Sequence, residues 1–184
     1  MPQPFDQALL EVIRKTDDDE PFDDYYRRVA PHLGSYPKEV VSEWLYRHDN
    51  FISRFGHHDL SQWSFEEAIF TTNNTLDVEL SPSKKANVID VGNNIWRDQW
   101  TREAEPALSM RYTGTFPSPI IIFNNAQKYC DYCGENYIGP YHLAEGHKRW
   151  GYINAITNYP GHCELIKPLS EEHKVYLLNM NGEI

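Results

Sequence analysis

One segment, residues 139–153, constrains the local fold more than any other part of this chain. A short apolar stretch ends at Gly146, and three residues that can carry positive charge follow at once: His147, Lys148 and Arg149. An amphipathic helical pattern begins there, so the segment predicts a strand, a glycine turn and a helix start. Backbone amides at a helix start carry partial positive charge. Together with the three cationic side chains, these amides predict a binding site for a phosphate group.

In the rest of the second half, the sequence predicts strands and helices on both sides of this turn. Apolar and β-branched runs predict strands, and apolar residues that recur on one face predict helices. The expected strands are residues 119–123, 141–144, 163–166 and 174–178, and the expected helices are residues 106–112 and 147–158.

The first third is predicted to be helical, with apolar residues on one face of helices that begin near Phe5, after Pro21 and after Pro37. Residues 65–70 fit a helix, because Ser64 and Glu67 resemble a capping box, or a strand. Two polar, turn-rich stretches follow at residues 71–75 and 80–85.

These patterns predict an α+β or α/β fold. A helical N-terminal segment, residues 1–79, would pack on a small mixed-sheet domain, residues 80–184.

Composition restricts the class of protein. The formal net charge of −10 disfavours a protein that coats nucleic acid by neutralising phosphates. Three cysteines, an odd number, favour a reducing compartment over a disulfide framework. Neither a basic-then-apolar leader nor an apolar run of ~20 residues is visible, so we expect a cytoplasmic protein without a membrane span.

The order of the elements in the second half resembles the ParB/sulfiredoxin superfamily of nucleotide-binding domains. In that group two strands precede a short box of the type G-E-R-R, G-C-H-R or D-G-H-H-R, and a helix and a strand follow. Residues 145–149, with the sequence EGHKR, occupy the position of the box, and we call them the box segment. It is most similar to the D-G-H-H-R version of free-serine kinases. His147 stands where sulfiredoxin has a cysteine, so reduction of sulfinic acid is not expected.

The resemblance implies a nucleotide ligand, such as ATP, ADP or CTP, with Mg²⁺ as a further cofactor. Gly146, His147, Lys148 and Arg149 would hold the phosphates. Glu145 would act on the metal or a proton, and His147 would serve as acid or base, which makes these two the candidate catalytic residues. Trp150, Tyr152 or Tyr129 would stack on the base, although each fits a core position as well.

A C-x-x-C-G sequence, in which Cys130 and Cys133 precede Gly134, is the second chemical motif. This turn allows two thiolates to reach one zinc ion. Two further ligands would come from His142, His147, His162 or Cys163, and none of them completes a standard spacing. A redox pair and two ordinary thiols are the alternatives.

The leading hypothesis is a nucleotide-dependent hydrolase or phosphotransferase. The alternative is a non-catalytic regulator of the antitoxin or immunity type, with a protein partner on the N-terminal helical segment. A ParB-like nuclease is the third hypothesis, which the acidic charge disfavours.

Overall fold

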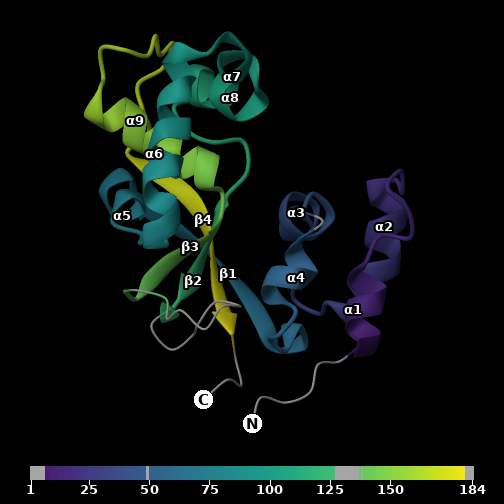
Figure 1. Ribbon diagram of the computed structural model, residues 1–184. Coiled ribbons are helices and arrows are strands. Elements are labelled where there is room, and N and C mark those ends of the chain that lie inside the picture. The colour runs from purple at the N-terminus through teal and green to yellow at the C-terminus, as the bar shows by residue number, and fades with distance from the viewer. Residues whose placement is uncertain (1–6, 49, 127–136, 138, 181–184) are drawn as a thin grey trace. The chain divides into compact units, whose positions relative to one another are not determined.

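The computed structural model describes residues 7–48, 50–126, 137 and 139–180 (Figure 1). About 51% of the chain is helical and 18% is strand, and the strands form one mixed four-stranded sheet. This confirms the α+β class. The helices in the described part of the chain are too short or too polar to cross a bilayer.

Internal contacts divide the chain into two compact units. Unit 1 comprises Met1–Glu66, Gln127–Tyr137 and Leu178–Ile184, and unit 2 comprises Glu67–Ala126 and Ile138–Leu177. The boundary expected near residue 80, between the helical segment and the mixed-sheet domain, stays a prediction.

Within residues 7–62 of unit 1, every regular element that the structure describes is a helix. Pro21 and Pro37 stand at the N-cap positions of two helices, as predicted, with extended backbone. The π-helical turn η2 continues directly from the short helix α3. The elements are α1 (Gln7–Ile13), α2 (Phe22–Val29), η1 (Ala30–His32), α3 (Lys38–Val40), η2 (Val41–Tyr46), α4 (Phe51–Phe55) and η3 (Leu60–Gln62).

An aromatic cluster forms the centre of unit 1. The ring centroid of Trp44 lies 5.0 Å from those of Phe51 and Phe55 and 5.8 Å from that of Trp63. All four side chains are buried. Edge-to-face and stacked aromatic pairs contribute about 0.5–1.5 kcal/mol each beyond the area they bury. Trp44 and Trp63 are therefore packing residues of unit 1.

A partly buried ion pair links the acidic residues 17–20, which follow α1, to α2. Arg28 Nη2 lies 2.7 Å from Oε2 of Glu20, which also accepts a hydrogen bond from the backbone amide of Thr16. Arg28 donates further hydrogen bonds to the carbonyl oxygens of Val12 and Arg14. The last carbonyls of α1, which have no partner within their own helix, are satisfied in this way.

The sheet has the spatial strand order β1-β4-β2-β3. Strands predicted at residues 119–123, 141–144 and 174–178 are present, and residues 65–70 form a strand rather than a helix. Backbone hydrogen bonds between Glu79 and the strand β3 cover part of the outer edge of that strand. The strands are β1 (Trp63–Thr71), β2 (Ile120–Asn124), β3 (Tyr141–Glu145) and β4 (Glu172–Met180).

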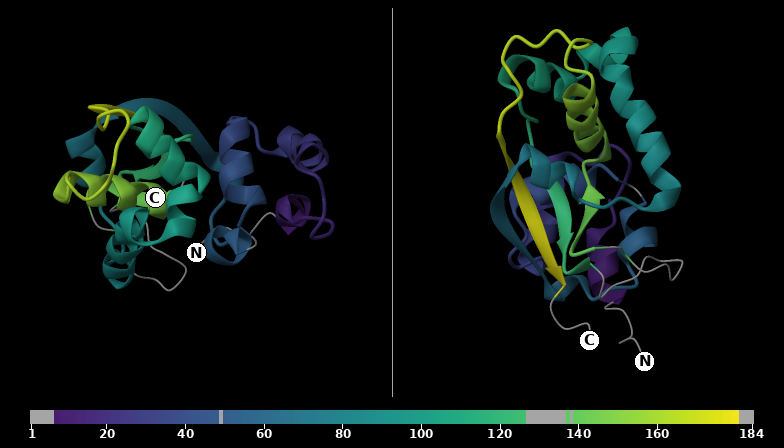
Figure 2. Two further views of the ribbon diagram at one scale, coloured as in Figure 1. Left: turned by 90° about the horizontal axis from the view of Figure 1, so that it is seen from above. Right: turned by 90° about the vertical axis from the view of Figure 1, so that its left-hand side faces the viewer.

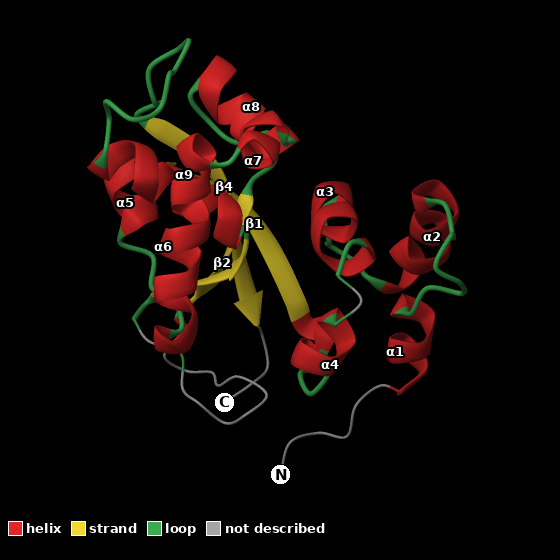
Figure 3. Ribbon diagram, turned by 45° about the horizontal axis from the view of Figure 1, so that its top comes forward, coloured by secondary structure: helices red, strands yellow, loops and turns green. Residues whose placement is uncertain are grey.

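Helices of unit 2 pack against the sheet, and α6 and α9 lie side by side in every view (Figures 2 and 3). The expected helices at residues 106–112 and 147–158 are confirmed. The core between helices and sheet includes Ile120, Ile122 and Leu143. The helices are α5 (Thr72–Leu76), α6 (Pro82–Arg97), α7 (Gln99–Glu103), α8 (Glu105–Thr113) and α9 (His147–Asn158).

Two local predictions for unit 2 are wrong. The stretches at residues 71–75 and 80–85, expected to be turns, form most of α5 and the start of α6, because packing against α9 stabilises these polar sequences as helices. Residues 163–166, expected to be a strand, form no strand. Their backbone instead forms hydrogen bonds with α8. The Ile166 N–H donates to the carbonyl of Arg111, and the Arg111 side chain donates to the carbonyl of Glu164.

Candidate functional site: the start of helix α9

The candidate site lies where β3 passes into α9. The register between β2 and β3 shifts here: Ile121 pairs with Glu145 while Ile122 pairs with Leu143, which leaves Ala144 as an extra residue. A β-bulge of this kind bends its strand and redirects the side chains beside it, and bulges are frequent near functional sites. The predicted strand–glycine–helix turn is therefore present, with a bulge immediately before it.

Gly146 is the N-cap of α9 and has a left-handed backbone with φ of +97°. A Cβ atom at this position would lie 2.5 Å from Cγ2 and 2.9 Å from Cβ of Ile120. Both the backbone conformation and the packing against β2 therefore require glycine. This requirement holds whether or not a ligand approaches the turn.

Arg149 points into the protein. Its side chain is 7% exposed, and Nη1 donates to the backbone carbonyl of Ser118 at 2.9 Å and also to the Ser118 hydroxyl. Nη2 lies 3.7 Å from Oε1 of Glu145, whose side chain is 14% exposed. Arg149 thus links the first turn of α9 to the segment before β2 and neutralises the carboxylate of the box segment.

The other two cationic residues of the box segment, His147 and Lys148, differ from Arg149 in their exposure to solvent. Lys148 is exposed, whereas His147 is half-buried. Gly146, the N-cap residue of α9, has no side chain to cap the helix, and the backbone hydrogen bond from Trp150 N–H to Gly146 O begins the helical ladder. The structure therefore brings Glu145, Gly146 and Arg149 together and directs Lys148 away from Arg149, toward solvent.

The aromatic residues considered for base stacking belong to the core where the structure describes them. Trp150 and Tyr152 are each 2% exposed. The indole N–H of Trp150 donates to the carbonyl of Thr75 at 2.8 Å, and burial raises the pKa of the Tyr152 hydroxyl. Tyr129 lies outside the described residues. Of the two interpretations, the core role holds for Trp150 and Tyr152.

The zinc hypothesis rests on Cys130 and Cys133, which lie outside the described residues. Among the described candidates for further ligands, His142 is buried with Nε2 3.4 Å from the Ser81 hydroxyl, and burial raises the pKa of the Cys163 thiol. Within the described ranges, His, Cys, Asp and Glu side chains form no group of three or more that could hold a metal ion. Zinc binding stays a prediction.

A buried histidine in unit 2 was not anticipated. His173 is 1% exposed and lies between two threonine hydroxyls, with Nδ1 2.9 Å from Oγ1 of Thr115 and Nε2 3.1 Å from Oγ1 of Thr72. The Thr72 hydroxyl gives its single proton to the carbonyl of Ser170, so it must accept from Nε2–H. Nε2 of His173 therefore carries a proton. Burial lowers the pKa of the ring from 6.5 to about 4, so His173 is neutral near pH 7.

Large apolar side chains are exposed on unit 2. Trp100 is 83% exposed and belongs to α7, a five-residue helix without a buried position. The other exposed residues on the helices of this unit and on the segment after α9 are Tyr112, Tyr159 and Ile166.

Comparison with protein-family models, curated proteins and solved structures finds no match to this chain. Membership of the ParB/sulfiredoxin superfamily stays a prediction based on the box segment and the order of the elements around it.

Proposed function

We propose that the protein binds a nucleotide through its phosphates at the start of α9. The observation that carries the proposal is the turn itself: a bulged strand, a left-handed Gly146 and a twelve-residue helix whose N-cap residue is a glycine. The amides and dipole of such a helix start favour an anion. A lysine in the first turn is unfavourable beside that dipole unless an anion neutralises it, and Lys148 is exposed there.

The residues of the box segment take different roles in this proposal. Lys148 and His147, with the backbone at Gly146, contact the phosphates. Arg149 is a positioning residue, because its guanidinium already bonds to Ser118 and faces Glu145. In the catalytic version, a hydrolase or phosphotransferase, Glu145 acts on Mg²⁺ or a proton and His147 is the acid or base.

Thermal unfolding of the full chain with ATP, ADP and CTP, each with and without Mg²⁺, tests the proposal. At a ligand concentration one hundred times Kd, binding stabilises the native state by about 2.7 kcal/mol. Lys148→Ala should reduce the shift strongly, whereas Lys167→Ala, which removes another exposed lysine of unit 2, should not. If all three nucleotides leave the midpoint unchanged, or if both variants respond as the wild type does, the site is not a phosphate site.

Turnover separates the catalytic from the non-catalytic version. Saturable nucleotide hydrolysis that disappears in Glu145→Gln, with binding retained, supports an enzyme. Binding without turnover in the wild type supports a nucleotide-gated regulator.

The second candidate is a non-catalytic, partner-binding regulator. Trp100 favours it, since its side chain is 83% exposed and tryptophan is enriched among the residues that carry binding energy at protein interfaces. This candidate predicts that Trp100→Gln loses a partner that the wild type binds, while nucleotide shifts stay as in the wild type. If a stoichiometric complex forms equally well with Trp100→Gln, Trp100 is not part of the partner-binding surface.

A further inference from the structure

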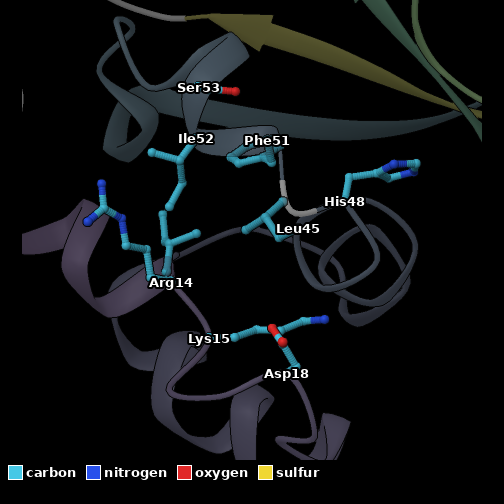
Figure 4. A pocket seen from close by; sticks show the side chains of 9 residues that line it. Arg14, Lys15, Asp18, Leu45, His48, Phe51, Ile52 and Ser53 are labelled. Atoms are coloured by element: carbon cyan, nitrogen blue, oxygen red, sulfur yellow. The ribbon is translucent and has the colours of Figure 1, made fainter.

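Unit 1 contains a pocket of about 400 Å³ between the end of α1, the end of η2 and the start of α4 (Figure 4). Pockets that bind small molecules are typically ~300–1,000 Å³ in volume. The space is therefore sufficient for a compact organic ligand. It lies wholly within residues 13–53, so it is separate in sequence from the start of α9.

Apolar side chains form much of the wall. Ile13, Leu45 and Phe51 are buried, and Ile52 is half-buried beside them. In Figure 4 Phe51 and Ile52 face the charged side chains of Lys15 and Asp18 across the pocket. A ligand with an apolar body would pack against these side chains, and the surface that it removes from water is chiefly that of the half-buried Ile52.

The charged part of the wall is net positive. Arg14 and Lys15 contribute two positive charges and Asp18 one negative charge, so the lining carries +1 with His48 neutral, in a chain of net charge −10. Arg14 pairs with Glu11 at 3.1 Å, but both side chains are more than half exposed, so the pair contributes little and a ligand can replace it. Lys15 Nζ lies 4.4 Å from the ring centroid of Tyr46. These cations favour an anion, and Asp18 opposes a second negative charge.

Hydrogen bonds from neighbouring elements hold the pocket's backbone in place. The Tyr25 hydroxyl donates to the carbonyl of Ile13 at 2.8 Å, and Arg28 donates to the carbonyl of Arg14 at 3.0 Å. The Tyr46 hydroxyl donates to the carbonyl of Glu20 at 2.7 Å. A wall that is fixed before binding loses less conformational entropy when a ligand enters.

A second, independent observation comes from η2. This six-residue segment, Val41–Tyr46, is π-helical. π-Helical turns are rare and are frequently found at functional sites. Leu45 lines the pocket from this turn, and Tyr46 contacts Lys15 from it.

We propose that this pocket binds a small organic anion, with an apolar aromatic or aliphatic body and one carboxylate-like group. The body packs on Leu45, Phe51 and Ile52. The anionic group lies beside Arg14 or Lys15, whose charged ends point to different sides of the pocket in Figure 4. This proposal does not rest on nucleotide binding at α9.

Two fluorescent probes with one ring skeleton test the proposal on the full chain. 8-Anilinonaphthalene-1-sulfonate carries an anionic group, and N-phenyl-1-naphthylamine lacks it. We expect one equivalent of the sulfonate to bind, with a Kd about tenfold lower than that of the neutral probe, because charged hydrogen bonds contribute on that scale.

Variants then locate the binding. The double variant Arg14→Met and Lys15→Met should raise the Kd of the sulfonate about tenfold and change that of the neutral probe less than about twofold. Arg27→Met is the matched control, because Arg27 is an exposed cation of unit 1 outside the pocket lining. It should change neither value. Ser53→Trp, at an exposed position on the rim, should weaken both probes by filling the mouth.

Cooperative urea unfolding of each variant confirms that the native state is present. Should the double variant fail to fold, Ser53→Trp carries the test alone. The proposal is overturned if the wild type binds neither probe, if both probes bind equally well, or if folded pocket variants bind as Arg27→Met does.

Discussion

Gly92 of α6 faces Gly151 of α9 at the point where the two helices cross. A Cβ atom on Gly92 would lie 2.3 Å from the carbonyl oxygen of Gly151, and one on Gly151 would lie 2.6 Å from the carbonyl oxygen of Val88. The two backbones are therefore in direct contact, and α9 is held at a separation that only glycine permits. The candidate site stands at the first turn of this same helix.

Replacement of Gly92 should destabilise unit 2. Gly92→Ala gains up to about 1 kcal/mol of helix propensity but must separate two backbones, and overpacking of this kind costs about 1–3 kcal/mol or more. We expect a net loss of about 2 kcal/mol in the free energy of unfolding, measured by urea titration and circular dichroism. Gly161→Ala is the control, because nothing lies within 4 Å of its Cβ position. Equal stability of the two variants would show that the helix contact tolerates a methyl group.

Arg149 and Lys148, adjacent in the box segment, should differ in their effect on folding. Arg149→Met removes hydrogen bonds to Ser118 and leaves the largely buried Glu145 without its cation, which should cost about 2–4 kcal/mol. Lys148→Met should change the unfolding free energy by less than about 0.5 kcal/mol, since the side chain is exposed. Addition of Glu145→Gln to Arg149→Met should recover part of the loss. A loss as small as that of Lys148→Met would contradict the positioning role of Arg149.

His173 should make stability depend on pH. Its pKa is about 4 in the native state and 6.5 in the unfolded chain, because burial disfavours the charged ring. Between these values the unfolded state binds more protons, so stability is complete above pH 6.5 and falls as pH drops toward 4. The contribution is about 3 kcal/mol, since each pKa unit corresponds to 1.36 kcal/mol.

Unfolding titrations of His173→Gln from pH 4 to 7 would measure this effect. The variant should lose most of the slope, whereas His162→Gln, at an exposed histidine, should retain it. An unchanged slope in His173→Gln would mean that other groups produce the pH dependence.

The neighbours Arg28 and Arg27 offer another matched pair. Arg28→Met should cost about 2–4 kcal/mol, because it leaves Glu20 buried without a cation and removes donors from the end of α1. Arg27 pairs with an exposed Asp24, so Arg27→Met should cost less than about 0.5 kcal/mol. Urea unfolding at pH 7 compares them, and equal losses would refute the proposed role of the buried pair.

Acid should weaken the same pair. Desolvation acts to raise the pKa of the Glu20 carboxyl, but hydrogen bonds from Arg28 and the Thr16 amide outweigh it and lower the pKa below 4.5. The contribution is therefore present above pH 4.5 and is lost as pH falls below it. Arg28→Met should remove this part of the acid sensitivity, as unfolding between pH 3 and 6 would reveal.

Much of the fold could be predicted because its signals are local. The strand at residues 119–123 and the helix at residues 147–158 repeat apolar residues at the period of their backbone. Helix α6 could not be predicted in this way, since its sequence is polar and contains Gly92 and three asparagines. Its stability comes from contact with α9, which lies more than fifty residues later in the chain.

For the candidate site, the glycine turn and the helix start were predictable, but the direction of each cation was not. Lys148 and Arg149 look alike in sequence. Ser118, thirty-one residues before Arg149, supplies the acceptor that draws one guanidinium inward. Trp100 illustrates the same limit, because a tryptophan in a polar segment carries no sign of whether another element will cover it.

The amino-acid sequence by itself determined the α+β class, the strand–glycine–helix turn and the charge of the box segment, since these depend on residues close together in the chain. The tertiary structure alone decided that Arg149 neutralises Glu145, that His173 is buried and neutral, and that Arg14 and Lys15 border a pocket. The physical reason is that burial and charge pairing depend on which distant segments meet, whereas backbone periodicity depends on neighbouring residues.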